Sequence, residues 1–369
     1  MENKTLEKQI RPSVFELTPY VPAKPVEEMR EELGLSRIVK LDANENALGT
    51  SPLALQAMES QMGSLNRYPD GYFQGLRRAL AKHWHVDEEQ VIAGNGSDEV
   101  LSLIAQTFLG EGDEMIVVDP TFSSYEFYAT IMGARVIHLS LEPDTYGLSV
   151  DGLLGAVTDR CKIVCVCTPN NPTGLLIDAA SMERLVRELP KDVLLVVDEA
   201  YFEYVTDERA VSAAEYLDED RLLLVSRTFS KIYGLAALRV GYALTSKAVA
   251  GFMGRVRSPF NINSLAQAAA AAAIGDEAHR EASRAMNEEG KRFLYGKLKE
   301  LGVPYLPTQA NFIFAKTGNA ARVRELLLEK GVVIRASSSY GEDWVRITIG
   351  TMEENRILAG ALAEVLAER

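Results

Sequence analysis

Short apolar runs rich in β-branched residues alternate with segments of helical periodicity from residue 90 onward. Because the runs are almost continuously apolar and helical segments separate them, they predict a mostly parallel sheet buried on both faces. The predicted strands cover residues 91–93, 115–118, 136–139, 163–167, 193–197, 222–225 and 240–244. This alternation is typical of an α/β domain.

The pattern changes after Pro259, where a second, smaller unit is predicted. An alanine-rich segment begins a helical region that we expect to reach about residue 301, where Gly302 and Pro304 end it. The remaining sequence predicts strands at 311–314, 332–335 and 344–349, a helix at 322–330 and a final helix from residue 353. Strands and helices mixed in this way indicate an α+β domain.

The N-terminal segment carries prolines at positions 12, 19, 22 and 25, which exclude one continuous helix over the first 30 residues. We expect an extended arm followed by a charged helix near residues 26–33. The length of 369 residues favours two domains in one subunit. We therefore predict an arm that also contributes to the small domain (1–42), a large domain (43–262) and a small C-terminal domain (263–369).

Composition and charge narrow the classes of function. The net charge of −13 at pH 7 argues against nucleic acid or an anionic membrane as a partner. No apolar run approaches the roughly 20 residues that a membrane span needs, and the N-terminus lacks the apolar core of a signal peptide, so we expect a cytoplasmic protein. Cys161, Cys165 and Cys167 all lie in the run 161–167, which is typical of a buried strand, and the four histidines are scattered, so we expect buried thiols and no metal site.

Most polar motifs follow predicted strands, at the edge of the sheet where open α/β sheets bind ligands. Lys231 comes soon after the run 222–225, and a lysine amine becomes a useful nucleophile where it is desolvated. Asp198 follows the run 193–197, where its carboxylate could either serve such a site or cap the next helix.

Two further features suit anions. Gly94-Asn95-Gly96 precedes Ser97, which is expected to be the N-cap of an amphipathic helix, and the N–H groups of such a helix start suit a phosphate. Arg346 is a charge within the apolar run 344–349. A buried arginine needs a partner, which could be a protein carboxylate or a ligand anion.

Six motifs in this order resemble the histidinol-phosphate aminotransferase family, one of the fold-type I families that use pyridoxal 5′-phosphate (PLP). They are Asn95-Gly96-Ser97-Asp98-Glu99, Asn170-Asn171-Pro172-Thr173-Gly174, Asp198-Glu199-Ala200-Tyr201, Arg227-Thr228-Phe229-Ser230-Lys231, Leu238-Arg239-Val240-Gly241-Tyr242 and Arg346-Ile347-Thr348-Ile349-Gly350-Thr351. The resemblance extends from about residue 15 to the C-terminal helix. It implies a fold-type I transferase, with helices wrapping the mostly parallel sheet of the large domain and a smaller α+β domain beside it.

The resemblance also implies roles for individual residues in PLP chemistry. Lys231 would form the Schiff base with the cofactor and move the proton, and Asp198 would face the pyridine nitrogen. Tyr201 and Asn171 would flank the phenolic oxygen of the cofactor, and Phe122 would stack on its ring or simply pack in the core. The phosphate would be held by Ser97, Ser230 and Arg239, and by Tyr68 of the neighbouring subunit, which implies an obligate homodimer. Asp98 is also expected among the cofactor-binding residues.

For the substrate, the resemblance makes Arg346 the residue that binds the α-carboxylate, with Arg335 as a second anion contact. Tyr20 matches a residue that touches the substrate's phosphate, and Asn44 lies in a segment that closes over the pocket. Two departures from the family pattern, Ala47 and the loop 337–341, lie near the expected side-chain site and bear on substrate identity.

The leading interpretation is a PLP-dependent transaminase of histidine biosynthesis, which converts imidazole-acetol phosphate and glutamate to histidinol phosphate and 2-oxoglutarate. An aminotransferase for phenylalanine, tyrosine or prephenate is the nearest alternative, because an imidazole pocket is already flat and apolar. A threonine-phosphate decarboxylase would keep the fold and change the reaction. A PLP-binding regulator is disfavoured, since about 40 residues of N-terminal arm are too few for a DNA-binding module.

Overall fold

The computed structural model describes residues 4–19 and 24–368. Two sheets form the centre of the molecule, one of seven strands and one of four. In the order of the larger sheet, the strands are β2 (Val91–Gly94), β8 (Gly241–Thr245), β7 (Leu223–Thr228), β6 (Leu194–Asp198), β5 (Cys161–Cys167), β3 (Glu114–Asp119) and β4 (Arg135–Ser140). All neighbours pair in parallel except β8, which is antiparallel to β2 and β7. The predicted α/β sheet is confirmed.

Both faces of this sheet are buried, because alternate strand residues enter two different hydrophobic clusters. Val196 and Leu224 pack on one side with α5 (Gly96–Phe108) and α6 (Ser124–Ile131), whereas Val197 and Val225 pack on the other side with α8 (Ala179–Glu188). The three cysteines are buried and unpaired within these clusters. Helices of this unit are α3 (Pro52–Glu59), α4 (Gln74–Trp84), α5 (Gly96–Phe108), α6 (Ser124–Ile131), α7 (Val150–Gly155), α8 (Ala179–Glu188), α9 (Lys247–Val256) and α10 (Ser264–Ala273).

The smaller sheet has the order β1 (Val39–Leu41), β10 (Val332–Ala336), β11 (Trp344–Thr348) and β9 (Phe312–Lys316). The early strand β1 pairs in parallel with β10, so the N-terminal segment completes this sheet. One face packs on α11 (Glu277–Glu300), α12 (Ala320–Glu329) and α13 (Met352–Ala367). The domain boundaries at 42/43 and 262/263 stay a prediction.

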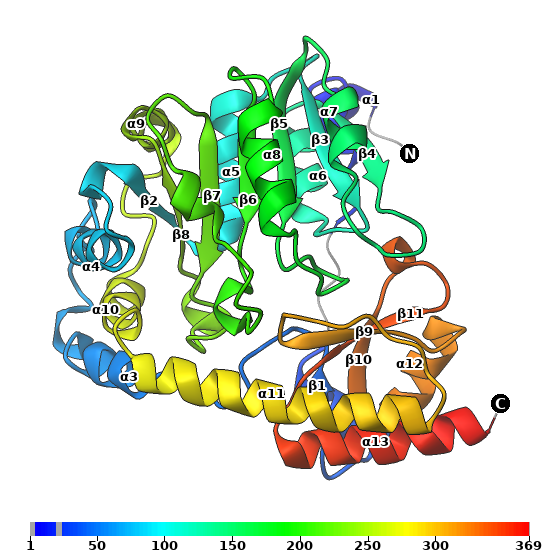
Figure 1. Cartoon of the computed structure of the whole chain (residues 1–369). Helices are drawn as coiled ribbons and strands as arrows, with labels where there is room; N and C mark the ends of the chain where they lie inside the picture. Colours follow the sequence, from blue (N-terminus) through cyan, green and yellow to red (C-terminus); the bar gives the residue numbers. More distant parts are fainter. Residues whose placement is uncertain (1–3, 20–23, 369) are drawn as a thin grey trace.

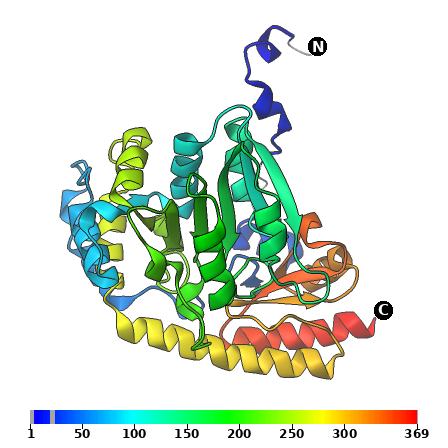
Figure 2. The same cartoon turned by 45° about the horizontal axis from the view of Figure 1, so that its top comes forward.

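Several local features differ from the expected pattern. The helical region after residue 264 is two helices, because Gly275 and Asp276 separate α10 from α11, and Asp276 caps the second. Figure 1 shows α11, in yellow, lying below both sheets. The arm contains α1 (Lys4–Glu7), η1 (Pro12–Glu16) and α2 (Val26–Leu33), and in Figure 2 its blue first part projects beyond the main body.

Short 3-10 helices connect the larger elements, at η2 (Met62–Ser64), η3 (Glu88–Gln90), η4 (Phe202–Tyr204), η5 (Ala213–Tyr216), η6 (Ala236–Leu238) and η7 (Ser338–Tyr340). Throughout the described ranges, no helix is both long enough and apolar enough to cross a membrane.

Candidate active site

The predicted site residues gather where the carboxyl ends of β2, β5, β6 and β7 meet. Asp198 is the last residue of β6, in register with Cys167 of β5 and Ser226 of β7. The loop after β7 carries Ser230 and Lys231, and the loop after β5 carries Asn171. Arg346 and Thr348 lie on one face of the small sheet, and Arg346 donates a hydrogen bond to Asn171. This edge of the large sheet therefore meets the small unit.

Lys231 is partly buried between the two units. Its Nζ donates a hydrogen bond to the carbonyl oxygen of Ala43 at 3.1 Å and lies 5.7 Å from the ring centre of Tyr201. Burial lowers the pKa of Lys231 to about 8, and the positive charges of Arg346 and Arg239 act in the same direction. A larger fraction of this amine is therefore uncharged and nucleophilic near neutral pH than for a solvated lysine.

Asp198 is 3% exposed and is held by two hydrogen bonds. The hydroxyl of Tyr125 donates to Oδ2 at 2.7 Å, and the backbone N–H of Ala200 donates to Oδ1 at 3.0 Å. Burial raises the pKa of Asp198 to about 6, while these two hydrogen bonds oppose that shift. The carboxylate closes a local turn and caps no helix, since the next helical turn, η4, has Tyr201 at its N-cap.

A cup for an anion lies at the start of α5. The N-cap is Asn95, whose side chain makes no capping hydrogen bond, so the prediction of Ser97 as the cap was wrong; Ser97 lies in the first turn. Gly96 has φ +82°, and a Cβ there would come within 2.7 Å of the Arg239 guanidinium. Arg239 contacts Asp98 at 3.0 Å and the hydroxyl of Ser230 at 3.4 Å. Backbone N–H groups, hydroxyls and a guanidinium thus converge on one side of the site.

Arg346 is 8% exposed, and its hydrogen-bond partners are neutral. Nη1 donates to Oδ1 of Asn171 at 2.7 Å and Nη2 donates to the carbonyl oxygen of Asp42 at 2.6 Å. In the part of the chain that the structure describes, its Nε makes no hydrogen bond. A buried guanidinium with neutral partners and an unused donor suits a ligand anion. Arg335 lies directly opposite Arg346 in the β10–β11 pair.

Further predicted residues adjoin this group. The hydroxyl of Tyr201 accepts a hydrogen bond from Nδ2 of Asn44 at 3.0 Å, and Oδ1 of Asn44 accepts one from Thr348 at 3.1 Å. The ring of Phe122 packs edge-to-face on Tyr125, with ring centres 5.6 Å apart, and it borders the hydrophobic cluster of α5 and α6.

One predicted residue does not join the group. Tyr68 is 83% exposed and its ring stacks on Phe260, with ring centres 4.8 Å apart. Tyr20 lies outside the described residues.

Two contacts were missed by sequence reasoning. The Ala43 carbonyl that accepts from Lys231 is a backbone atom, for which sequence offers no signal. Tyr125 looked like an ordinary aromatic residue near a helix start, and its partner Asp198 lies 73 positions away.

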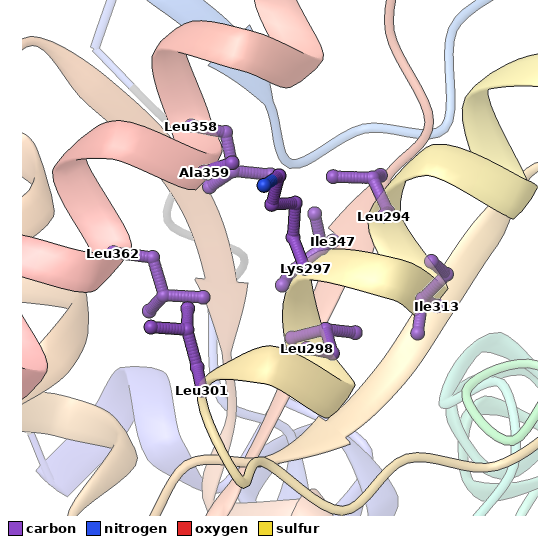
Figure 3. A pocket seen from close by; sticks show the side chains of 9 residues that line it. All are labelled: Leu294, Lys297, Leu298, Leu301, Ile313, Ile347, Leu358, Ala359 and Leu362. Atoms are coloured by element: carbon purple, nitrogen blue, oxygen red, sulfur yellow. The ribbon is translucent and has the colours of Figure 1, made fainter.

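A separate hollow lies inside the small unit and is unrelated to this site. It is lined mainly by leucines of α11 and α13, among them Leu294, Leu298, Leu358 and Leu362. Figure 3 shows these side chains pointing toward one another, with Lys297 beside them. The lining offers no convergent polar groups, so the hollow is a gap in the packing of the helices.

The sequence pattern of the family "Aminotransferase class I and II" matches residues 36–362. The chain belongs to this family. A histidinol-phosphate aminotransferase of Moorella thermoacetica is 44% identical over 97% of this chain and 93% of that protein. A histidinol-phosphate aminotransferase 2 of Pseudomonas aeruginosa is 42% identical over 97% of both chains.

Solved structures agree with this membership. The histidinol-phosphate aminotransferase of Sinorhizobium meliloti, in complex with pyridoxal 5′-phosphate, superposes with a TM-score of 0.89 at 26% identity, covering 98% of both chains. An aspartate aminotransferase of Thermus thermophilus superposes with a TM-score of 0.85 at 24% identity, covering 96% of this chain and 99% of that one, and shares the fold. The predicted fold-type I architecture of this aminotransferase is confirmed.

Proposed function

We propose that this aminotransferase uses PLP to transfer an amino group between glutamate and imidazole-acetol phosphate, giving 2-oxoglutarate and histidinol phosphate in histidine biosynthesis. The observation that carries the proposal is the meeting of Lys231, Asp198 and the α5 cup with Arg346 at one edge of the sheet. The two relatives named for this activity, at 44% and 42% identity over nearly the whole chain, support the substrate.

The residues present fit PLP. Lys231 would hold the cofactor through its ε-amine, and Asp198 would face the ring nitrogen from its buried position. The start of α5 with Ser97, Ser230 and Arg239 would hold the phosphate. Bound PLP withdraws electrons from the substrate carbon that carries the amino group. Tyr201 and Asn171 would contact the phenolic oxygen, and Phe122 would cover the ring.

The chain's own groups would then move protons and position the substrate. Nζ of Lys231, with its lowered pKa, is suited to accept a proton from the substrate carbon and to return it to a neighbouring atom. Arg346 and Arg335 would bind the carboxylate of glutamate in one half-reaction and the phosphate of histidinol phosphate in the other. Asn44, bonded to Tyr201, and Tyr20 would complete the substrate side.

The test is a half-reaction of purified enzyme loaded with PLP. Histidinol phosphate, glutamate and phenylalanine are added separately, and loss of the cofactor's visible absorption is followed. We expect fast loss with the first two and a far slower change with phenylalanine. An equal or faster change with phenylalanine would make the protein an aromatic aminotransferase. A protein that takes up no PLP would refute the whole proposal. Lys231→Ala is the control, which should bind PLP weakly and show no half-reaction.

We further propose that the enzyme is a cytoplasmic homodimer in which Tyr68 reaches the cofactor of the neighbouring subunit. Tyr68 stacks on Phe260 and both are exposed, as are the apolar side chains of Met62, Leu65 and Tyr72, which lie close to Tyr68 in the sequence. Exposed apolar side chains of this kind suit an interface between subunits.

Tyr68→Phe removes only the hydroxyl, so we expect an unchanged dimer by sedimentation and weaker retention of PLP during dialysis. Tyr72→Phe, at a residue that is also exposed (67%), should retain PLP like the natural protein. A monomeric protein, or equal retention by both variants, would contradict this arrangement.

A further inference from the structure

Tyr125, near the start of α6, connects two groups that the proposed function assigns to the cofactor. Its hydroxyl donates to Oδ2 of Asp198 at 2.7 Å, and its ring packs edge-to-face against Phe122. Tyr125 is 1% exposed and Asp198 is 3% exposed, so water does not compete for this hydrogen bond. One side chain from a helix thus contacts both a carboxylate at the end of the sheet and the aromatic ring that the proposed function assigns to the cofactor.

We propose that Tyr125 is a positioning residue that keeps Asp198 ionised and correctly oriented toward the PLP ring nitrogen. This inference rests on the proposed function. A neutral hydroxyl donating to a buried carboxylate favours its charged form, which the low-polarity surroundings otherwise disfavour. The second oxygen, Oδ1, is occupied by the Ala200 N–H. The two bonds together fix the plane of the carboxylate, so the atom offered to the cofactor is set before binding.

Among the described residues, Tyr125 is the side chain that donates a hydrogen bond to Asp198. Other titratable groups also interact with Asp198. They are the thiols of Cys165 and Cys167 on β5, the neighbouring Glu199, the more distant Asp98, and Tyr201. Burial raises the pKa of both thiols, so they carry no charge that could replace the hydroxyl. Glu199 and Asp98 further raise the pKa of Asp198.

The proposal predicts a specific pH dependence. In the apoprotein, burial raises the pKa of Asp198 to about 6, and loss of the Tyr125 hydrogen bond would raise it further. In the complex, a protonated ring nitrogen would hold Asp198 ionised with or without Tyr125. By linkage, the ionisation effect weakens PLP binding by the variant at pH values where its apoprotein carboxyl is protonated, in addition to a pH-independent loss from the freed carboxylate orientation. A rise of about one pKa unit corresponds to about tenfold weaker binding below both pKa values and, from this cause, no difference above them.

The experiment is titration of apoprotein with PLP, followed by fluorescence, for the natural protein, Tyr125→Phe and Tyr233→Phe. Tyr233 is the matched control, because its buried hydroxyl has no hydrogen-bond partner within the described ranges. We expect Tyr125→Phe to raise the dissociation constant about tenfold more near pH 5.5 than near pH 8.5, where only the loss of carboxylate orientation remains. Tyr233→Phe should match the natural protein at both pH values.

Two results would overturn the proposal. A weakening by Tyr125→Phe that is equal at both pH values would mean that the residue acts through packing alone. Equal binding by all three proteins at both pH values would mean that the hydroxyl has no influence on the carboxylate. Failure of the natural protein to bind PLP would instead refute the proposed function, so the two failures are distinguishable.

Discussion

Replacement of Arg227 by methionine tests whether a buried ion pair supports the segment that carries Lys231. Arg227 is 2% exposed and lies four residues before the lysine, at the end of β7. Its Nη1 contacts Glu203 at 3.0 Å, and its Nη2 pairs with Glu199 and contacts Ser212 at 3.1 Å. The guanidinium also lies over the ring of Trp84, 4.2 Å from the ring centre.

The magnitude follows from the carboxylate that the substitution leaves behind. Glu199 is fully buried, and removing one partner of such a pair costs about 3–5 kcal/mol because the remaining charge is uncompensated. We therefore expect Arg227→Met to lower the free energy of unfolding by about this amount at pH 7. Burial raises the pKa of Glu199, and Arg227 opposes the shift. Without the arginine Glu199 should protonate more readily, so the loss of stability should shrink as the pH falls.

The assay is equilibrium unfolding in urea, followed by tryptophan fluorescence. Arg184→Ala is the control, because Arg184 also contacts two carboxylates but on the exposed surface, where ion pairs contribute little. The double variant Arg227→Met/Glu199→Gln should recover part of the lost stability. A loss below about 1 kcal/mol for Arg227→Met, or a loss equal to that of the control, would refute the reasoning.

Three further predictions concern the site. Burial lowers the pKa of Lys231 from 10.5 to about 8, so Lys231→Met should stabilise the apoprotein at pH 7 by about 3 kcal/mol. This gain should disappear as the pH rises from 8 to 10.5. Urea unfolding across this pH range tests the prediction, and a pH-independent difference in stability would contradict it. Arg346→Ala should lower kcat/KM about 100-fold or more in both half-reactions, and an effect on only one would separate the two anion sites. A Cβ at Gly241 would meet the backbone nitrogen of Ser97 at 2.4 Å, so Gly241→Ala should weaken PLP binding, whereas Gly251→Ala, in open space, should not.

The large sheet was predicted well from the sequence, because each of its strands is marked by a short apolar run within the strand itself. Strand runs such as 163–167 and 222–225 are apolar at nearly every position, and the structure buries both of their faces. The break between α10 and α11 was missed, since the alanines on one side and the polar helix on the other both favour helix. The start of α5 was misplaced by two residues because Ser97 resembles a cap, whereas Gly96 at φ +82° already belongs to the first turn.

The candidate site was predictable only in part. Motifs at strand ends could be placed at one edge of the sheet from topology alone, as for Asp198 and Lys231. Contacts between distant segments could not, because nothing near Arg346 in the sequence points to its bond with Asn171, 175 positions earlier. The same holds for Tyr125. Its hydroxyl acquires a role only through the turn of the chain that places α6 over the end of β6.

Helix α11 connects the large and small units mechanically, because it contacts both of them. Its first part contacts the large unit, through Ser283 with Asn46 and Arg284 with the carbonyl of Glu203, and its second part packs under the small sheet. With 24 residues it is about 36 Å long. If α11 tilts as a rigid body by about 5° at its first turns, its far end moves by about 3 Å, roughly one hydrogen-bond length. A change of angle at the junction around Asn46 would therefore change how closely the arginines of the small sheet approach Lys231.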